Sequence, residues 1–176
     1  MSILKTNQIT DLGGNELLTS NGSGVISSGG AITNTPIWKA GITSQSLAYN
    51  TTTKVDYDNE ITDTDNAYDT TNKRFTVPSG KGGTYIVHTW YRVGTGTDSP
   101  SFDIFVYKNG SNLNNTEDMA SFTVNQSYNT VQCTGMLELS AGDYLEIYAR
   151  QAEVSGTYTI GYSNEGRFWG YKLIGA

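Results

Sequence analysis

The chain has 176 residues, a formal net charge of −6 and 16% charged residues. The 11 Lys and Arg residues are scattered, which argues against nucleic acid or an anionic membrane surface as the main partner, because binding phosphate groups needs clustered cations. The length suits one domain with an arm, and 20 Gly and 12 Tyr residues among abundant Thr, Ser and Asn favour strands and turns. We therefore expect an all-β protein.

Residues 1–34 differ from the rest, because short apolar pairs alternate with turns such as DLGGN and SNGSG. The segment has too little apolar surface to fold alone. It is either a disordered leader or an arm that pairs with copies of itself or with another protein, and its apolar side chains favour the second interpretation. The candidate residues for attachment to a carrier protein are Ile3, Leu4, Ile9, Leu17 and Leu18.

The Gly-rich and polar run at residues 27–36 is typical of a linker, so we expect an arm at residues 1–34 and a domain at residues 35–176. The N-terminal sequence lacks the basic start and apolar run of a secretory signal, and no later run is long enough to span a membrane. We expect a soluble protein that is made in a cytoplasm and does not insert into membranes.

After Pro36, short apolar runs are separated by turn signals. The predicted strands are IWKAG, QSLAYN, KVDYDN, KRFTV, TYIVHTWYRV, FDIFVYKNG, SFTV, TVQCTGMLEL, DYLEIYAR, TYTIGY and RFWGYKLI. Several have a two-residue period, and Asn109 with Gly110 is the strongest turn signal in the chain. About ten short strands in one domain favour a two-sheet antiparallel sandwich.

The run TYIVHTWYRV is apolar on both faces of its predicted strand. Its two faces would carry Tyr85, Val87, Thr89, Tyr91 and Val93 on one side, and Ile86, His88 and Trp90 on the other. Only one face of each sheet lies inside a sandwich, so the other face needs a cover, most simply another copy of the chain. The run RFWGYKLI repeats this pattern, with Trp169 and Tyr171 opposite Phe168 and Gly170. Both strands therefore indicate an obligate oligomer.

Three motifs follow one another in this part of the chain. They consist of Phe75, Val77, Pro78, Gly80, Gly83 and Tyr85, then Gly135, Leu137, Leu139, Gly142, Asp143 and Leu145, and finally Phe168, Gly170 and Leu173. In this order they resemble the complement-head and tumour-necrosis-factor jelly-roll superfamily, over essentially all of residues 36–176.

The resemblance implies a ten-stranded jelly roll and a compact homotrimer whose sheets meet at a threefold axis. The interface residues expected on this basis are Trp38, Tyr85, Tyr91, Gln132, Tyr144, Tyr148, Trp169 and Tyr171. Members of the superfamily often carry an aromatic residue near the axis where this chain has Gln132, so this axis would be wetter. The arm sequence LKTNQITDLGGNELLTSNGSG is similar to the N-terminal segments of bacteriophage tail-fibre and other virion appendage proteins, where such segments precede trimeric tip domains.

Enzymatic and metal-binding functions find little support in the sequence. His88 lies in the middle of a strand and no Gly-x-Ser-x-Gly elbow is present, so we interpret His88 as a packing residue and expect no catalytic activity. The lone Cys133 is interpreted as a buried small apolar residue. The stretch DYDNEITDTDNAYD could offer calcium its oxygen ligands, but its spacing is not that of an EF-hand, and we favour a plain acidic loop. The calcium candidates are Asp56, Asp58, Asp63 and Asp65, and we expect no other cofactor.

We therefore expect a non-enzymatic structural and binding protein. It would be a homotrimeric tip of a bacteriophage tail fibre or other appendage, made in the host cytoplasm and located on the virion surface. Its arm would bind another virion protein, and loops around Pro100, Asn115 and Ser155 would recognise a host cell-surface glycan or protein. The alternative is a purely architectural decoration protein of the capsid or tail, with no host ligand.

Overall fold

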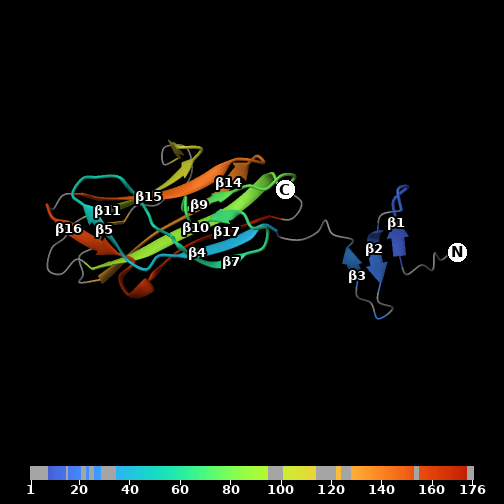
Figure 1. The fold of residues 1–176 in the computed structure, drawn as a ribbon, viewed down its shortest axis with the longest axis horizontal. Helices are drawn as coiled ribbons and strands as arrows, with labels where there is room; N and C mark the ends of the chain where they lie inside the picture. Colours follow the sequence, from blue (N-terminus) through green and yellow to red (C-terminus); the bar gives the residue numbers. More distant parts are fainter. Residues whose placement is uncertain are drawn as a thin grey trace. The chain divides into compact units, whose positions relative to one another are not determined.

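The computed structural model divides into two compact units, residues 1–33 and residues 34–174, which are described separately (Figure 1). The structure describes residues 8–14, 16–20, 23, 26–28, 35–94, 101–113, 122–123, 128–152 and 155–173.

The N-terminal unit contains a three-stranded antiparallel sheet of β1 (Gln8–Thr10), β2 (Glu16–Ser20) and β3 (Ile26–Ser28), in the order β1-β2-β3. The sequence predicted an extended arm rather than this local sheet. The turn between β1 and β2 explains the difference, because the Gly14 N–H donates to the Asp11 carbonyl at 3.1 Å and Gly14 has a φ of 83°. Glycine adopts this left-handed conformation without steric cost, so the chain can reverse direction here.

The described part of the head, the second unit, consists of two seven-stranded antiparallel sheets. The first sheet has the order β5 (Gln45–Ala48), β16 (Thr157–Ile160), β10 (Gly83–Gly94), β17 (Gly166–Lys172), β4 (Ile37–Gly41) and β7 (Asn59–Asp63), with β14 (Tyr128–Leu139) also paired to β10. The second sheet has the order β12 (Ser111–Asn112), β11 (Ser101–Lys108), β15 (Tyr144–Ala152), β9 (Arg74–Thr76) and β8 (Tyr68–Asp69), with β13 (Phe122–Thr123) on β11 and β6 (Thr53–Lys54) on β15. A 3-10 turn, Tyr162–Asn164, precedes β17.

The two sheets enclose one hydrophobic core. Trp38 of the first sheet stacks on Phe75 of the second, with ring centroids 3.6 Å apart. Tyr158 contacts Phe102 from the opposite sheet, with ring centroids 5.9 Å apart. Cys133 is 2% exposed in this core, which confirms that it is a buried residue. The sandwich that the sequence predicted is therefore present, and its interior is rich in aromatic side chains.

The two-residue periods in the sequence correspond to real strands. The residues of β10 alternate between buried and half-buried, with Tyr85 and Tyr91 inside. In β15, Leu145 and Ile147 are buried, so the predicted strand DYLEIYAR places these side chains in the core. The predicted turn after β11 is also confirmed, because Asn109 and the following Gly110 both have positive φ angles, 53° and 78°. Two consecutive residues of this conformation form the turn that best matches the twist of a hairpin.

The segment from residue 54 to residue 69 departs from the prediction. The predicted strand KVDYDN is interrupted: β6 ends at Lys54 and β7 begins at Asn59, so the residues between them belong to no strand. The sequence did not predict β7 or β8, which are rich in Asn, Asp and Thr, residues that make a weak strand signal when alternation is absent. Both strands lie at the ends of their sheets, β7 beside β4 and β8 beside β9, where polar side chains are tolerated.

Candidate functional site

The face of the first sheet that points away from the core carries apolar residues on four adjacent strands. Strand β10 places Ile86, His88 and Trp90 on this face, and β17 pairs with it so that Tyr171 lies opposite Ile86 and Trp169 opposite His88. Strands β14 and β4 extend the same rows. We define the outer face of the first sheet by Ile37, Lys39, Ile86, His88, Trp90, Met136, Arg167, Trp169 and Tyr171.

Several side chains of this face are strongly exposed. Met136 is 61% exposed and Ile37 is 36% exposed, and they lie at the two ends of one row of apolar residues that crosses four strands through Ile86 and Tyr171. The Trp169 and Tyr171 rings are parallel to within 2°, with centroids 6.3 Å apart, and border a shallow hollow of about 310 Å³ together with Ile37, Lys39 and Thr62. The structure thus confirms that β10 and β17 carry apolar residues on both faces.

Gly170 explains how β17 can pass so close to its neighbours. A Cβ atom at this position would lie 2.6 Å from the Trp38 Cζ2 atom and 2.6 Å from the Ile86 carbonyl oxygen. Real side chains do not approach a backbone atom this closely, so only glycine fits. The glycine lets the Trp38 ring fill the core beneath β17, while Trp169 and Tyr171 project outward on either side of it.

His88 lies in the middle of this face. Its Nδ1 atom is in hydrogen-bond contact with the Thr134 hydroxyl at 2.6 Å, and its ring centroid lies 4.9 Å from that of Trp169. Burial lowers the pKa of the imidazole below its ordinary value. A hydroxyl beside a histidine can act as a nucleophile, but catalysis also needs a group that orients the imidazole, and the described contacts of His88 include no carboxylate. The arrangement supports packing rather than catalysis.

Three residues predicted at a trimer interface lie instead in the core. Trp38, Tyr85 and Tyr91 are each 0% exposed, so they have no surface to offer another copy of the chain. The Tyr91 hydroxyl donates to the Asp103 carbonyl at 3.1 Å inside the sandwich, and burial raises the pKa of Tyr85 to about 12. The prediction was wrong for these residues because both faces of β10 are apolar, and the pattern alone does not show which face points inward.

Of the other interface candidates, Trp169, Tyr171 and Gln132 do lie on the outward side of the first sheet, and Gln132 is exposed opposite Trp90. Tyr144 and Tyr148 belong to β15 and therefore to the second sheet. They cannot share one sheet face with Trp169 and Tyr171, so the predicted interface residues do not lie on one surface.

The outward face of the second sheet is aromatic, but its rings are covered by their neighbours. The Tyr107 and Tyr148 rings lie 4.2 Å apart, and the Arg74 guanidinium lies 4.7 Å from the centre of the Tyr144 ring. Arg150 donates two hydrogen bonds to one oxygen of Asp103, at 2.6 and 2.9 Å. The aromatic rings named here thus have neighbours on their own sheet, although the buried Arg74 Nε has no hydrogen-bond partner among the described residues.

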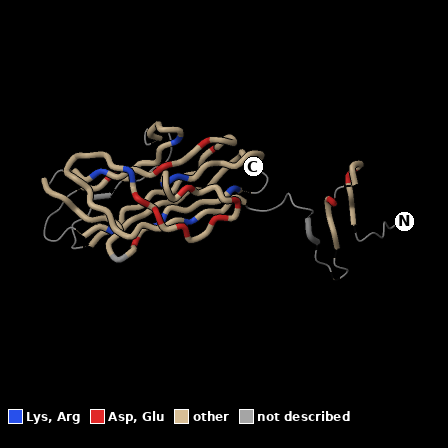
Figure 2. The backbone as a smooth tube through the Cα atoms, viewed as in Figure 1, with Lys and Arg blue, Asp and Glu red and all other residues tan. Residues whose placement is uncertain are grey.

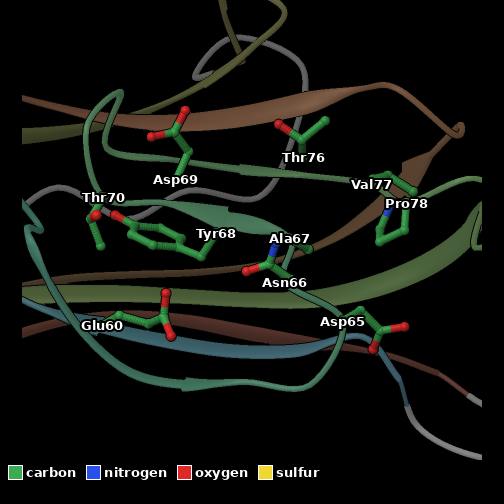
Figure 3. Close-up of a pocket in the computed structure, with 10 residues that line it drawn as sticks. All are labelled: Glu60, Asp65, Asn66, Ala67, Tyr68, Asp69, Thr70, Thr76, Val77 and Pro78. Atoms are coloured by element: carbon green, nitrogen blue, oxygen red, sulfur yellow. The ribbon is translucent and has the colours of Figure 1, made fainter.

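A polar pocket of about 590 Å³ lies between the end strands of the two sheets, beside β7, β8 and the turn that joins them (Figure 3). Three carboxylates line it, those of Glu60, Asp65 and Asp69, together with the side chains of Asn66 and Thr76. In Figure 3 Asp65 lies at the opposite end of the pocket from Glu60 and Asp69. The three carboxylates therefore do not converge on one point.

The calcium candidates do not form a metal site in the described part of the chain, where no three acidic, His or Cys side chains are close enough to hold an ion. Asp63 accepts hydrogen bonds from the Asp65 and Tyr68 N–H groups, at 3.2 and 2.7 Å, and so shapes the turn. Asp65 forms an ion pair with Lys81 at 3.5 Å. Asp56 and Asp58 are exposed residues on the segment before β7. The acidic stretch is thus a structured loop whose described carboxylates do not converge on one point.

Charged residues elsewhere are dispersed. Figure 2 shows Lys and Arg residues spread along the head among the Asp and Glu residues. Within the described residues, no helix has the length and apolar character needed to cross a bilayer.

The residues predicted to attach the arm are placed in part. Ile9 and Leu17 are 43% and 50% exposed, and Leu18 is half-buried opposite Ile9. Ile3 and Leu4 lie outside the described residues. Of the three predicted recognition loops, the positions around Pro100 and Asn115 also lie outside the described residues, whereas Ser155 is exposed.

Comparison with known proteins identifies the fold. No model of a protein family and no curated protein sequence matches the chain. Among solved structures, the head is similar to the globular domain of zebrafish Complement 1qA protein, with a TM-score of 0.52 and 13% identity over 78% of this chain and 97% of that chain. It is also similar to murine APRIL, with a TM-score of 0.54 and 12% identity over 78% of this chain and 98% of that chain. The predicted jelly-roll fold of the complement-head and tumour-necrosis-factor type is confirmed.

Proposed function

We propose that this chain is a non-enzymatic structural and binding protein that assembles as a homotrimer through the outer face of the first sheet. The observation that carries the proposal is the continuous row of Met136, Ile86, Tyr171 and Ile37 across four adjacent strands. Water would otherwise contact this row, at a cost of about 25 cal/mol for each Å² of apolar surface. The jelly-roll fold supports the same assembly, because the resemblance that predicted this fold also implied a trimer.

Within this proposal the head is the tip of a virion appendage, such as a bacteriophage tail fibre, located on the virion surface after synthesis in the host cytoplasm. The arm would attach it to another virion protein. Exposed apolar residues on the N-terminal sheet, Ile9 and Leu17, support an attachment role, because a three-stranded sheet of this size cannot bury its own apolar side chains.

The ligand of the head would be a host cell-surface glycan or protein, recognised by loops at the ends of the sandwich. The exposed Ser155 segment is the described candidate for such contacts. The second candidate function is a purely architectural decoration of a capsid or tail without a host ligand. The outward face of the second sheet favours this alternative. Its Arg150 side chain bonds Asp103 and its Tyr107 and Tyr148 rings contact each other, so these groups are less available to a ligand.

The mass of the purified full-length protein in solution tests the assembly. The monomer has a mass of 19.1 kDa, and light scattering should give three times this value. A monomeric mass would reject the homotrimer. A screen of the trimer against glycans and intact host cells then separates the two functions, because an architectural protein would bind neither while remaining trimeric.

A further inference from the structure

His88 occupies the centre of the surface that the proposed homotrimer would bury. The pairing of four strands places Thr134, His88, Trp169 and Lys39 in one row across β14, β10, β17 and β4. The imidazole touches the first and third members of this row, at 2.6 Å from the Thr134 hydroxyl and 4.9 Å between ring centroids for Trp169. It is the one histidine of the chain. A single group that changes charge near neutral pH therefore lies in the middle of an apolar face.

The charged groups around His88 on this face are mostly positive. On β17, Arg167 lies diagonal to it beside Trp169, and Lys39 lies beyond Trp169 on β4. On β14, its diagonal neighbours are the uncharged Gln132 and Met136.

The described carboxylates nearest this face lie toward its ends and already have partners. Glu165 forms an ion pair with Arg92, and Glu138 accepts a hydrogen bond from the Thr84 hydroxyl. The other titratable group near His88 on β17 is the Tyr171 phenol, which lies diagonal to it. No described carboxylate on the flanking strands thus pairs with a protonated His88.

The two charge states of the imidazole therefore differ in the free-energy cost of burial by a second copy of the chain. The neutral ring keeps its contact with Thr134 and packs on Trp169, so a second copy can bury it at little cost. The protonated ring would add a positive charge to a face that already carries Arg167 and Lys39, and burial would remove the water that solvates it. A buried charge without a partner is strongly unfavourable.

We propose that His88 makes the homotrimer sensitive to acid: the outer face of the first sheet holds its neighbouring copies while the imidazole is neutral and releases them once it is protonated. The inference rests on the proposed homotrimer and adds a regulatory property to the same surface.

The direction of the effect follows from proton linkage. Burial within the single chain already lowers the pKa of His88 below its ordinary value of 6.5. A second copy that covers this face would remove more of the water around the imidazole and lower its pKa further, so the assembled state would bind fewer protons than the separated chains. Assembly is then strongest above the pKa of the separated chain and weakens as the pH falls below it. Each imidazole can reduce the association constant by at most about tenfold per pH unit, and three copies by at most about a thousandfold.

The test is sedimentation equilibrium of the full-length protein at constant ionic strength, from about pH 7.5 to about pH 5, where few carboxylates titrate. The wild type is compared with His88→Gln, whose amide can still bond Thr134 but carries no charge at any pH. We expect the wild-type association constant to fall by at least about tenfold over this range while that of His88→Gln stays constant within about twofold.

The outcomes separate the two proposals. A wild-type monomer at about pH 7.5 rejects the homotrimer itself, and the histidine inference with it. A wild-type trimer whose association constant is the same at both ends of the range overturns the histidine inference and leaves the homotrimer standing. Equal pH dependence in the wild type and His88→Gln would also overturn it, because another group would then be responsible.

A second measurement covers the case in which His88→Gln does not fold. The wild-type protein has one imidazole, so its Cε1 proton resonance reports His88 without further variants. At each protein concentration, the trimer should dissociate over the same pH range in which the chemical shift of this resonance changes. Dissociation that is complete before the resonance moves, or that begins only after it has finished moving, would overturn the inference.

Discussion

Trp38 and Phe75 stack across the two sheets of the head, with ring centroids 3.6 Å apart and planes inclined by 8°. Both side chains are 0% exposed. The pair joins β4 of the first sheet to β9 of the second, so it ties together segments whose strands have no hydrogen bonds in common. It is therefore the contact at which the stability of the sandwich is best probed.

Replacing Phe75 by Ala should lower the free energy of unfolding by about 3–5 kcal/mol, because the missing ring leaves a cavity beside Trp38. Phe75→Leu is the matched control and should cost less, since most of the volume is retained. Urea unfolding followed by tryptophan fluorescence measures both. A loss below about 1 kcal/mol for Phe75→Ala would contradict the role of this stack in the core.

Gly170 should not tolerate even the smallest side chain. A Cβ would meet the Ile86 carbonyl oxygen at 2.6 Å, so Gly170→Ala should destabilise the head by about 1–3 kcal/mol or prevent folding. Gly135 provides the control, because a Cβ there would meet no atom within 4 Å. Gly135→Ala should be neutral or slightly stabilising in thermal unfolding. Similar losses for the two variants would show that the close approach at Gly170 is not the cause.

Trp169→Asp should convert the proposed homotrimer into a folded monomer. The substitution places a carboxylate on the outer face of the first sheet, where assembly would strip it of water. Tyr49→Asp serves as the control, because Tyr49 is an exposed aromatic residue, 47% accessible, outside the defined face. Light scattering gives the mass and near-ultraviolet circular dichroism reports the fold. A Trp169→Asp trimer with unchanged affinity would place the interface elsewhere.

Removal of residues 1–30 should leave the head folded and trimeric, because the core of the head consists of residues from position 38 onward. The truncated protein should have a melting temperature within a few degrees of that of the full chain. Light scattering should give three times the mass of the truncated chain. Binding to the carrier protein should be lost. If the truncation unfolds the head instead, the two units are not independent.

Asp143 should contribute to stability only above acidic pH. The Asn109 amide, the Ser140 N–H and the Lys108 ammonium contact its carboxylate at 2.7, 2.8 and 3.0 Å, and these contacts hold its pKa below the usual value of 3.8. A carboxyl with a lowered pKa stabilises the fold above its unfolded value and loses this effect as the pH falls through the folded value.

The Asp143→Asn variant should therefore be less stable than the wild type at neutral pH, and the difference should shrink as the pH drops below about 4. Urea unfolding at a series of pH values measures this difference. A difference that is constant down to about pH 2.5 would show that the carboxylate charge is not involved.

Much of the fold was accessible from the sequence because local patterns encode it. The alternation in FDIFVYKNG predicted β11, and Asn109 with Gly110 predicted the turn that follows. The sequence prediction was poorest for residues 54–69, because the Asp, Asn and Thr residues of β7 and β8 give a weak strand signal. These strands form because neighbouring strands offer them hydrogen bonds, which no local pattern reports.

The candidate site was predicted only in part. Trp169 and Tyr171 were correctly placed on an outward face, whereas Tyr85 and Tyr91 were not. Asp63 and Asp65 looked like cation ligands, but the Tyr68 N–H and Lys81 occupy them. Their partners come from the turn itself and from beyond β9, so the sequence spacing of the acidic residues did not show that they were already engaged.

The sequence by itself determined that this chain is all-β, that β10 and β17 are apolar on both faces, and that one histidine lies among those apolar residues. A two-residue period contains this information, because successive side chains of a strand point to opposite faces. Only the tertiary structure decided which face is inside. Trp38 packs on Phe75 and against Gly170, and this close packing turns Tyr85 and Tyr91 inward and leaves His88 and Trp169 on the outer face. Which face points inward depends on contacts between segments that are distant in the sequence, and the two-residue period of one strand does not report such contacts.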